Sequence, residues 1–301
     1  MGVLFAFLAM LCFASNIMIT RSAVARLPVE AGFFIVLVTN IVFPAAVYPF
    51  ELAARAAPWA WSWKGVALFA LGGFIGTFLG RRFLFDAVKI LGPSRASVFH
   101  STAPAFALVG AWLLADEALG WYEILLMAVI WIGLWFTQPR AGSSSSLSPE
   151  AMRRGMFVGL MTVAGFGLGN VVRGLGMRDW PEAVFGTVVS STAAFLCQIV
   201  ATRDWPKILG QLRGASRSAV LLYTGCGVTT ALGAIFAAVA MRHMEIALVV
   251  LVIHTTPLVI FPVSVFVLKN REELTPRTVT GAGIVLGGIA LLALRQAALH
   301  S

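Results

Sequence analysis

Two short polar motifs interrupt otherwise apolar runs of this 301-residue chain. The first is FHSTAP at Phe99–Pro104, and the second is IHTTP at Ile253–Pro257. A proline inside a helix removes one backbone hydrogen bond and weakens the helix locally. Within a bilayer the freed carbonyl groups need partners, which Ser and Thr hydroxyls can supply. The motifs therefore predict a pair of helix hinges at Pro104 and Pro257, each with a polar face directed into the protein.

Each motif also carries a histidine that could contact a solute. On a helix His100, Ser101 and Pro104 share one face, and His254 is placed similarly with respect to Pro257. Ionisable side chains within membrane spans are costly and usually functional, so we expect His100, Ser101 and His254 to line a solute-binding cavity. Because a histidine titrates near neutral pH, both rings are also candidates for a proton relay. The alternative is that each ring only hydrogen-bonds a neighbouring helix.

A cluster of charges, GRRFLFDAVK, ends the third apolar run. Arg82 and Asp86 are four residues apart and can pair on a helix, and Asp86 is a third candidate for the relay. Arg81 has no carboxylate one turn further on and lies on the face of Thr77. A guanidinium is suited to bind a carboxylate or phosphate through two parallel hydrogen bonds, so we expect Arg81 and Thr77 to contact the solute. If the helix ends near Gly80, the same charges are ordinary anchors at the membrane surface.

Neutral hydrogen-bonding groups complete the predicted site. These are Asn16, Asn170 and Thr230. The cysteines have no metal-ligand spacing, and no catalytic motif or paired intramembrane carboxylate is found. We therefore expect no metal, no cofactor and no enzymatic activity. The acidic residues that follow two of the apolar runs are expected to be solvated at span ends; they are Asp116, Glu117, Glu272 and Glu273.

The composition indicates what kind of scaffold must position these groups. The chain is 59% hydrophobic and only 12% charged, and its apolar residues form blocks of about 20, the length that crosses a bilayer as a helix. The sequence predicts an all-α polytopic membrane protein whose partners are the lipid bilayer and a small-molecule solute. The net charge of +9 then concerns membrane orientation and lipid headgroups, and we expect no nucleic-acid partner. Ten transmembrane helices are predicted, at about 3–20, 31–50, 65–90, 94–115, 121–138, 155–172, 182–201, 219–241, 247–268 and 279–294.

The two halves of the chain are weak repeats of each other. At an offset of 153 residues, Thr77 matches Thr230 and Pro104 matches Pro257. The predicted organisation is a first five-helix repeat at 1–138, a Ser-rich linker at 139–154 and a second five-helix repeat at 155–301. An odd number of spans inserts the second repeat from the opposite side of the membrane. Such inverted repeats are typical of secondary transporters, which bind solute where the halves meet.

In this arrangement the sequence resembles the EamA domain of the drug/metabolite transporter superfamily, once per half. The resemblance is carried by Asn16 near the end of the first span, by GTFLG…FLFDAVKILGPSRAS before a proline-bearing span, and by ADEALGWYEI before a glycine-containing span. It implies a ten-helix exporter or exchanger of metabolites. One feature departs from the family pattern: the arginine usual early in the second span is absent from AGFFIVLVTNIVFP, which has Thr39 and Asn40 instead.

The leading hypothesis is a secondary transporter of a small polar or anionic metabolite, such as an amino acid or organic acid, that works by alternating access between the repeats. A lipid-carrier flippase of the same fold is the alternative, and a membrane-embedded enzyme is a third. The first span has no acidic residue, which argues against the proton-for-drug exchange of the small multidrug resistance proteins.

The expected location is a bacterial inner membrane, as a multi-pass protein. The excess of Lys and Arg in alternate loops favours both termini outside, whereas the family resemblance favours both termini in the cytoplasm. The oligomeric state is open, with a homodimer as one candidate.

Overall fold

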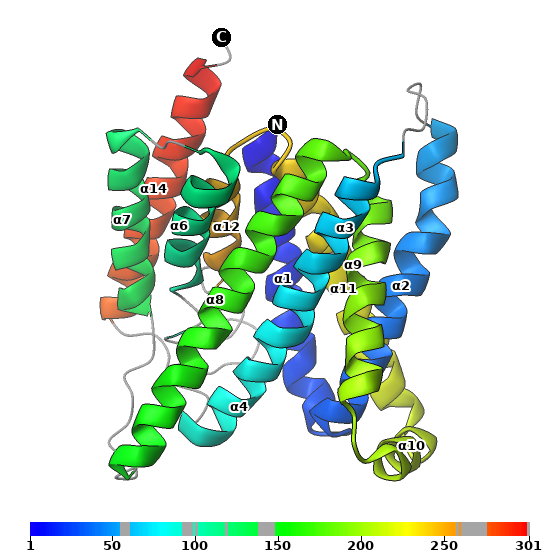
Figure 1. Ribbon diagram of the computed structural model, residues 1–301. Helices are drawn as coiled ribbons and strands as arrows, with labels where there is room; N and C mark the ends of the chain where they lie inside the picture. The colour runs from blue at the N-terminus through cyan, green and yellow to red at the C-terminus, as the bar shows by residue number, and fades with distance from the viewer. Residues whose placement is uncertain are drawn as a thin grey trace. The chain divides into compact units, whose positions relative to one another are not determined.

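The structure is a computed structural model that describes residues 1–54, 61–91, 99, 102–117, 120–137, 148–256, 259 and 276–299 (Figure 1). Within these ranges the regular structure is helical and contains no strand. Six helices are long and apolar enough to cross a membrane, which confirms a multi-pass, all-helical membrane protein. The number ten stays a prediction, since several predicted spans fall partly outside the described residues.

The six long helices are built from eight helical segments. They are α1 (Gly2–Val24), α2 (Val29–Ala54), the continuous run of α3 (Trp63–Gly72), η1 (Gly73–Gly80) and α4 (Arg81–Leu91), then α8 (Pro149–Asp179), α9 (Ala183–Ala201) and α11 (Arg217–Ala240). The other described helices are α6 (Ala103–Ala115), α7 (Trp121–Thr137), α10 (Trp205–Arg213), α12 (Ile246–His254) and α14 (Pro276–Leu299).

Several helices begin where a polar side chain satisfies their first backbone N–H groups. Ser62 accepts a hydrogen bond from the N–H of Gly65 at the start of α3. Ser216 does the same at the start of α11, and Asp204 at the start of α10. Such caps stabilise a helix end by about 1 kcal/mol, so these short sequence signals locate the boundaries between long apolar runs.

Two elements differ from the sequence prediction. The predicted sixth span, 155–172, is only the middle of α8, which begins at Pro149 and ends at Asp179. The last residues of the predicted linker are therefore helical, while 139–147 lie outside the described residues. The short helix α10, with sequence WPKILGQLR, was not predicted; it follows α9 at the end of that helix (Figure 1).

The chain divides into two compact units that do not coincide with the two sequence halves. Unit 1 contains Met1–Phe78 and Val172–His243, and unit 2 contains Leu79–Val171 and Met244–Ser301. Each unit thus takes a part of each half. The chain passes from one unit to the other three times: inside η1, inside α8 and between His243 and Met244, after the end of α11.

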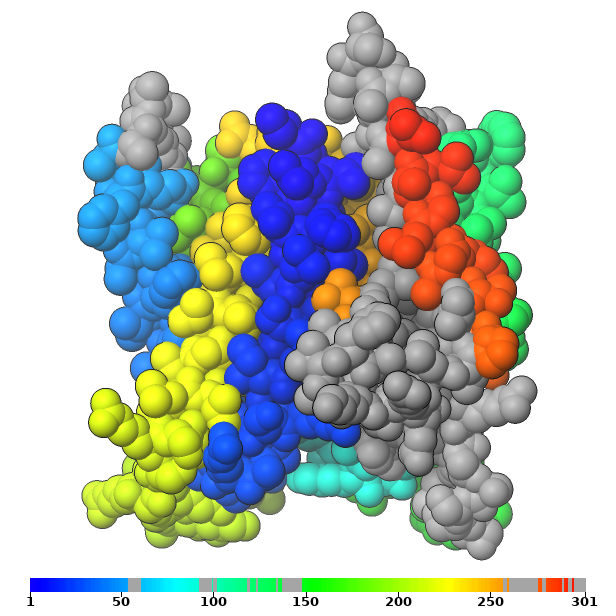
Figure 2. All heavy atoms as spheres, turned by 180° about the vertical axis from the view of Figure 1, so that it is seen from behind, coloured from blue at the N-terminus to red at the C-terminus, as the bar shows by residue number. Residues whose placement is uncertain are grey.

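In unit 1, α11 packs against α1, α2 and α9, and α2 and α3 also contact α9. Figure 2 shows α1 and α11 side by side along much of their length. A cluster of buried side chains joins α3, α8, α9 and α11; it includes Phe69, Met177, Trp180 and Ile235. Large aromatic side chains such as the fully buried Trp180 contribute most of the apolar area in such a core.

In unit 2, α7 packs against α14, and α6 packs against α12. Helix α8 approaches α6 closely at Gly167, where an added Cβ atom would lie 2.7 Å from the Cβ of Phe106. Small residues at such positions let helices approach within a membrane, where packing replaces the hydrophobic effect as the driving force.

Candidate functional site

The amide of Asn16 joins α1 to α11 inside unit 1. Its Nδ2 donates to the backbone carbonyl of Cys226 at 2.7 Å and to the Oγ1 of Thr230 at 2.8 Å. Next to this contact, the hydroxyl of Thr20 lies 3.3 Å from the thiol of Cys226. The structure therefore brings together two predicted site residues, Asn16 and Thr230, although more than 200 residues separate them in the sequence.

A second contact of the same kind joins α8 to η1, also inside unit 1. The Nη2 of Arg173 donates to the Oγ1 of Thr77 at 2.5 Å, and both side chains are half-buried. Thr77 was predicted as a site residue, but Arg173 was not. The sequence prediction ended the sixth span at Val172 and left Arg173 in a loop, whereas α8 continues for seven residues beyond Val172, to Asp179.

The threonines of the two contacts occupy equivalent places in the repeat, whereas the donors do not, since Arg173 follows Asn16 by 157 residues. Thr77 and Thr230 match at the offset of 153 residues, each on the third long apolar helix of its half. Each threonine receives a hydrogen bond from the first long helix of the other half, from Asn16 in one case and from Arg173 in the other. The two contacts differ in charge, because an amide is neutral and a guanidinium is cationic.

The helix around Thr77 is π-helical from Gly73 to Gly80. Long π-helical segments are rare, and they occur frequently at functional sites. At Gly73 the backbone of α9 comes so close that an added Cβ atom would lie 2.1 Å from the carbonyl oxygen of Ser190. The hydroxyl of Ser190 donates to the carbonyl of Phe69 at 2.6 Å. The contact with α9 thus stabilises the third long helix at the point where its hydrogen bonds change from the α-helical to the π-helical pattern.

Asn40, in the middle of α2, is a further polar group within unit 1. Its side chain is only 4% exposed, and its Oδ1 has no hydrogen-bond partner among the described residues. A buried acceptor without a partner costs about 1–3 kcal/mol. In the sequence Asn40 stands out only as a departure from the family pattern, whereas its burial in the structure distinguishes it from the many polar residues at helix ends.

The first of the two opening motifs is described in part. His100 and Ser101 lie outside the described residues. Pro104 is buried in the first turn of α6, which begins at Ala103. A proline there removes no helical hydrogen bond, because the first N–H groups of a helix have no partner within it. Pro104 therefore begins a helix, and its predicted role as a hinge stays a prediction.

The second motif ends a helix. His254 is half-buried at the last residue of α12, with its Nδ1 2.8 Å from the carbonyl oxygen of Val250 in the preceding turn. The buried hydroxyls of Thr255 and Thr256 donate to the carbonyls of Val252 and Ile253, both at 2.6 Å. The threonines thus satisfy carbonyl groups at this helix end, while Pro257 lies outside the described residues.

The remaining predicted site residues belong to unit 2. The third long helix continues past Gly80, so Arg81 and Asp86 are helical and half-buried. Among the described side chains, no ion pair joins Asp86 to Arg82. The Nδ2 of Asn170 donates to the carbonyl of Phe166 in its own helix, at 3.0 Å.

Glu117 corrects an expectation about the acidic residues at span ends. Its side chain is buried rather than solvated, with 7% exposed. Its Oε1 accepts a hydrogen bond from the N–H of Ile246 at 2.9 Å, and its Oε2 accepts one from Ala247 at 3.4 Å. These are the first two residues of α12, where a negative charge is favourable. Glu117 therefore fixes the start of the helix that carries His254.

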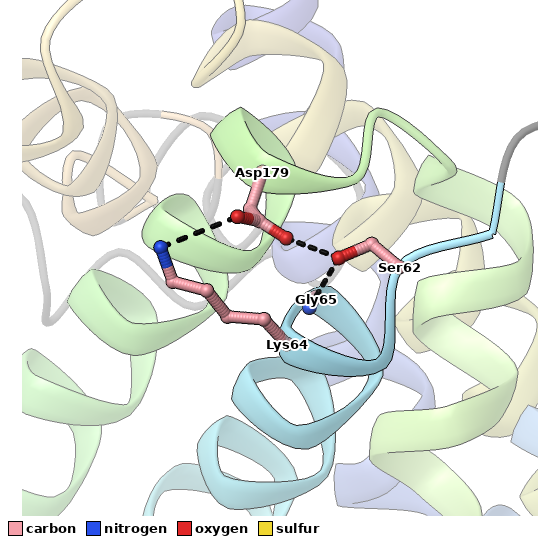
Figure 3. A network of polar contacts seen from close by, with 4 residues as sticks. All are labelled: Ser62, Lys64, Gly65 and Asp179. Atoms are coloured by element: carbon pink, nitrogen blue, oxygen red, sulfur yellow. Dashed lines mark hydrogen bonds and ion pairs between the residues drawn. The ribbon is translucent and has the colours of Figure 1, made fainter.

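A polar network joins the start of α3 to the end of α8 in unit 1 (Figure 3). The hydroxyl of Ser62 donates to the carboxylate of Asp179 and accepts from the N–H of Gly65. Lys64 forms an ion pair with the same carboxylate at 3.3 Å. The network fixes the end of α8, about two turns from Arg173, but it is exposed and is better suited to positioning helices than to binding a solute.

Two hollows in the described part of the chain lie at the start of α8. One, of about 520 Å³, is lined by Pro149, Glu150 and Arg153. A second, of about 420 Å³, shares Glu150 and Arg153 with it. In the described part of the chain, no group of three or more His, Cys, Asp or Glu residues is placed to hold a metal ion.

Comparisons with known proteins identify the scaffold. A family model described as the EamA-like transporter family matches residues 1–138 and again residues 153–294. A solved structure described only as "Crystal structure of protein" has the same fold, with a TM-score of 0.74 and 17% sequence identity over 100% of this chain and 99% of that one. The search of curated proteins gives no match.

Proposed function

We propose a transport function for this chain, which belongs to the EamA-like transporter family of the drug/metabolite transporter superfamily. The protein is a secondary transporter, an exporter or exchanger, of a small polar or anionic metabolite such as an amino acid or organic acid. It works as a multi-pass protein of a bacterial inner membrane, and its partners are the solute and the surrounding lipid.

The observation that carries this proposal is the pair of equivalent threonine contacts. Thr77 and Thr230 carry half-buried hydroxyls on apolar helices, and each accepts a hydrogen bond from a polar side chain of the opposite sequence half. Polar groups inside membrane helices are costly and usually serve a pathway. Their repetition at equivalent positions fits a transporter built from inverted repeats.

Alternating access would use the long helices in which the chain passes from one compact unit to the other. In this proposal ten helices form two inverted repeats, and the movement occurs where long helices pass between the compact units. One passage lies within the π-helical segment η1, and the other lies within α8, next to Gly169 and Gly174. Sharp kinks in helices occur at π-helical turns, so this segment is a natural place for the helix to bend.

The test is solute uptake by the purified full-length protein in liposomes. Neutral, cationic and anionic amino acids and organic acids are supplied one at a time, and uptake is compared with that of empty liposomes. We expect saturable uptake of at least one solute. Thr77→Val and Thr230→Val should each reduce it about tenfold or more, because each removes a hydrogen-bonding hydroxyl without changing side-chain volume.

Thr39→Val is the matched control. The hydroxyl of Thr39 bonds only to the carbonyl of Ile35 in its own helix among the described contacts, so uptake by this variant should stay within about twofold of wild type. The absence of uptake and of counterflow across the whole panel would contradict a transport function. Equal uptake by all three threonine variants would remove Thr77 and Thr230 from the site.

A further inference from the structure

Helix α10 is too short to cross a bilayer, and its two faces differ in character. Its nine residues, WPKILGQLR, extend over about 14 Å at 1.5 Å per residue, compared with about 30 Å for the hydrocarbon core of a bilayer. On a helix Trp205, Ile208, Leu209 and Leu212 share one side, and Lys207 projects from the opposite side. A short helix with an apolar face and a basic face is typical of segments that lie in the plane of the membrane surface.

The apolar face of α10 is only partly covered by the protein. Ile208 is buried, and the ring of Trp205 packs against the ring of Phe34 on α2, with 5.3 Å between their centroids. Leu209 is instead 44% exposed, as is Val200, at 86%, in the last turn of α9. The contact with α2 therefore holds the helix in place, while one apolar edge remains available to the bilayer.

Basic residues from several parts of unit 1 gather at the end of the unit where α10 lies, after α9 and before α11 (Figure 1). The hydroxyl of Tyr223 in α11 donates to the carbonyl of Leu27 at 2.9 Å. The start of α11 is thus close to the turn that joins α1 to α2, and Trp205 places α10 at the same end of α2. The basic residues there are Arg21, Arg26, Arg203, Lys207, Arg213 and Arg217.

These six cations form no ion pair within the described part of the chain, and all six side chains are exposed. Two carboxylates lie at the same end, on Glu30 and Asp204. The carboxylate of Asp204 accepts a hydrogen bond from the N–H of Lys207 at the start of α10. Among the described residues, this end of unit 1 therefore has an excess of four positive charges.

We propose that α10 and the basic residues around it form a docking surface for anionic phospholipid headgroups. The exposed apolar edge enters the membrane interface, and the cations contact the phosphate groups of the lipids. Each Lys or Arg near an anionic membrane surface contributes about a fivefold preference for that surface. Basic loops can orient a membrane protein without an amphipathic helix between them, so orientation alone does not require this arrangement. The inference goes beyond the proposed transport function and does not depend on it.

The experiment compares the full-length protein in nanodiscs of phosphatidylcholine with nanodiscs that also contain phosphatidylglycerol with the same acyl chains. Amide hydrogen exchange is followed by mass spectrometry in peptides that cover α10. Phosphatidylglycerol should slow this exchange about threefold or more, because bound lipid opposes local opening of the helix. At about 1 M salt, where the screening length falls to about 3 Å, the effect should disappear. Exchange around Ser62 and Gly65, at the other end of unit 1, should not depend on the lipid.

The double variant Lys207→Gln with Arg213→Gln removes two of the exposed cations. It should lower the preference for phosphatidylglycerol about 25-fold and thereby abolish the protection of α10. The double variant Lys207→Arg with Arg213→Lys keeps both charges and should retain the protection. Arg242→Gln is the control for position, because it removes an exposed cation from the other end of unit 1; it should respond to lipid as wild type does. Unchanged exchange in α11 shows that each variant is folded.

The docking surface would be overturned by equal exchange of α10 in both lipids at low salt. A wild-type response in Lys207→Gln with Arg213→Gln would overturn it as well. If inorganic phosphate slowed exchange to the same extent in phosphatidylcholine nanodiscs, the occupant would be free phosphate and the assignment to lipid would be wrong. The measurement involves no solute uptake, so its failure leaves the transport function standing, and a failure of the uptake assay leaves the docking surface standing.

Discussion

The buried carboxylate of Glu117 gives a quantitative prediction about the start of α12. It accepts hydrogen bonds from the N–H groups of Ile246 and Ala247, at 2.9 and 3.4 Å. The first N–H groups of a helix have no partner within the helix, so without Glu117 both would be left without this acceptor. The perturbation is Glu117→Gln, which keeps the shape of the side chain and removes the charge and one acceptor oxygen.

The expected magnitude follows from these contacts. A hydrogen bond to a charged group contributes about 1.5–3 kcal/mol, and a negative charge at a helix start adds about 0.3–1 kcal/mol. Because glutamine retains one acceptor, we expect Glu117→Gln to cost about 2–3 kcal/mol. Glu117→Ala should cost about 3–4 kcal/mol, since both N–H groups lose their partner. At about 2–4 °C per kcal/mol, the glutamine variant should lower Tm by about 4–12 °C.

The assay is thermal unfolding of the purified full-length protein in one detergent at one scan rate. Asp116→Asn is the matched control, because it removes the same charge from the neighbouring, exposed residue. Asp116 has a positive φ of 51°, a conformation that asparagine also tolerates. Its Tm should therefore stay within about 1 °C of wild type.

Amide hydrogen exchange supplies a local readout. Exchange at Ile246 and Ala247 should become faster in Glu117→Gln, while exchange in α11 stays unchanged. A Tm for Glu117→Gln equal to that of Asp116→Asn, or unchanged exchange at these two amides, would refute the assignment of Glu117 as the cap of α12.

Three further predictions concern unit 1. Asn16→Leu and Thr230→Val should each lower stability, and a double-mutant cycle should give a coupling of about 0.5–1.5 kcal/mol; strictly additive losses would contradict a direct bond. Gly73→Ala should lower Tm by several degrees or prevent folding, because the added Cβ would lie 2.1 Å from a backbone oxygen of α9. Gly210→Ala is the control and should leave Tm nearly unchanged, since nothing lies within 4 Å of its added Cβ. Similar Tm values for the two variants would be incompatible with the close approach of α9. The helix ends around α10 should face the cytoplasm, because basic residues gather there. A cysteine that replaces Gly214 should therefore not be labelled by an impermeant maleimide added to intact cells. Labelling of this cysteine would show that the protein has the opposite orientation. Among the described residues of unit 1, the basic ones at that end are Arg21, Arg26, Arg203, Lys207, Arg213 and Arg217, compared with Lys64, Arg178 and Arg242 at the other end.

Much of the scaffold could be predicted because apolar length and the repeat are properties of the chain itself. The third span was predicted at 65–90, and the structure has one continuous helix from Trp63 to Leu91. Apolar length predicts a helix end wrongly where a charged residue lies inside a helix. Ending the sixth span before Arg173 misplaced that residue in a loop, although the sequence after it, GLGM, is uncharged and could have indicated that the helix continues.

Sequence alone determined the family, the helical class and the pairing of positions such as Thr77 with Thr230, because hydrophobic period and repeat offset are local and linear properties. Only the tertiary structure decided which polar groups meet. Asn16 reaches Thr230 and Arg173 reaches Thr77 because the first long helix of each half packs against the third long helix of the other. Glu117 is buried for the same kind of reason: a helix start distant in the sequence supplies the N–H groups that its carboxylate needs.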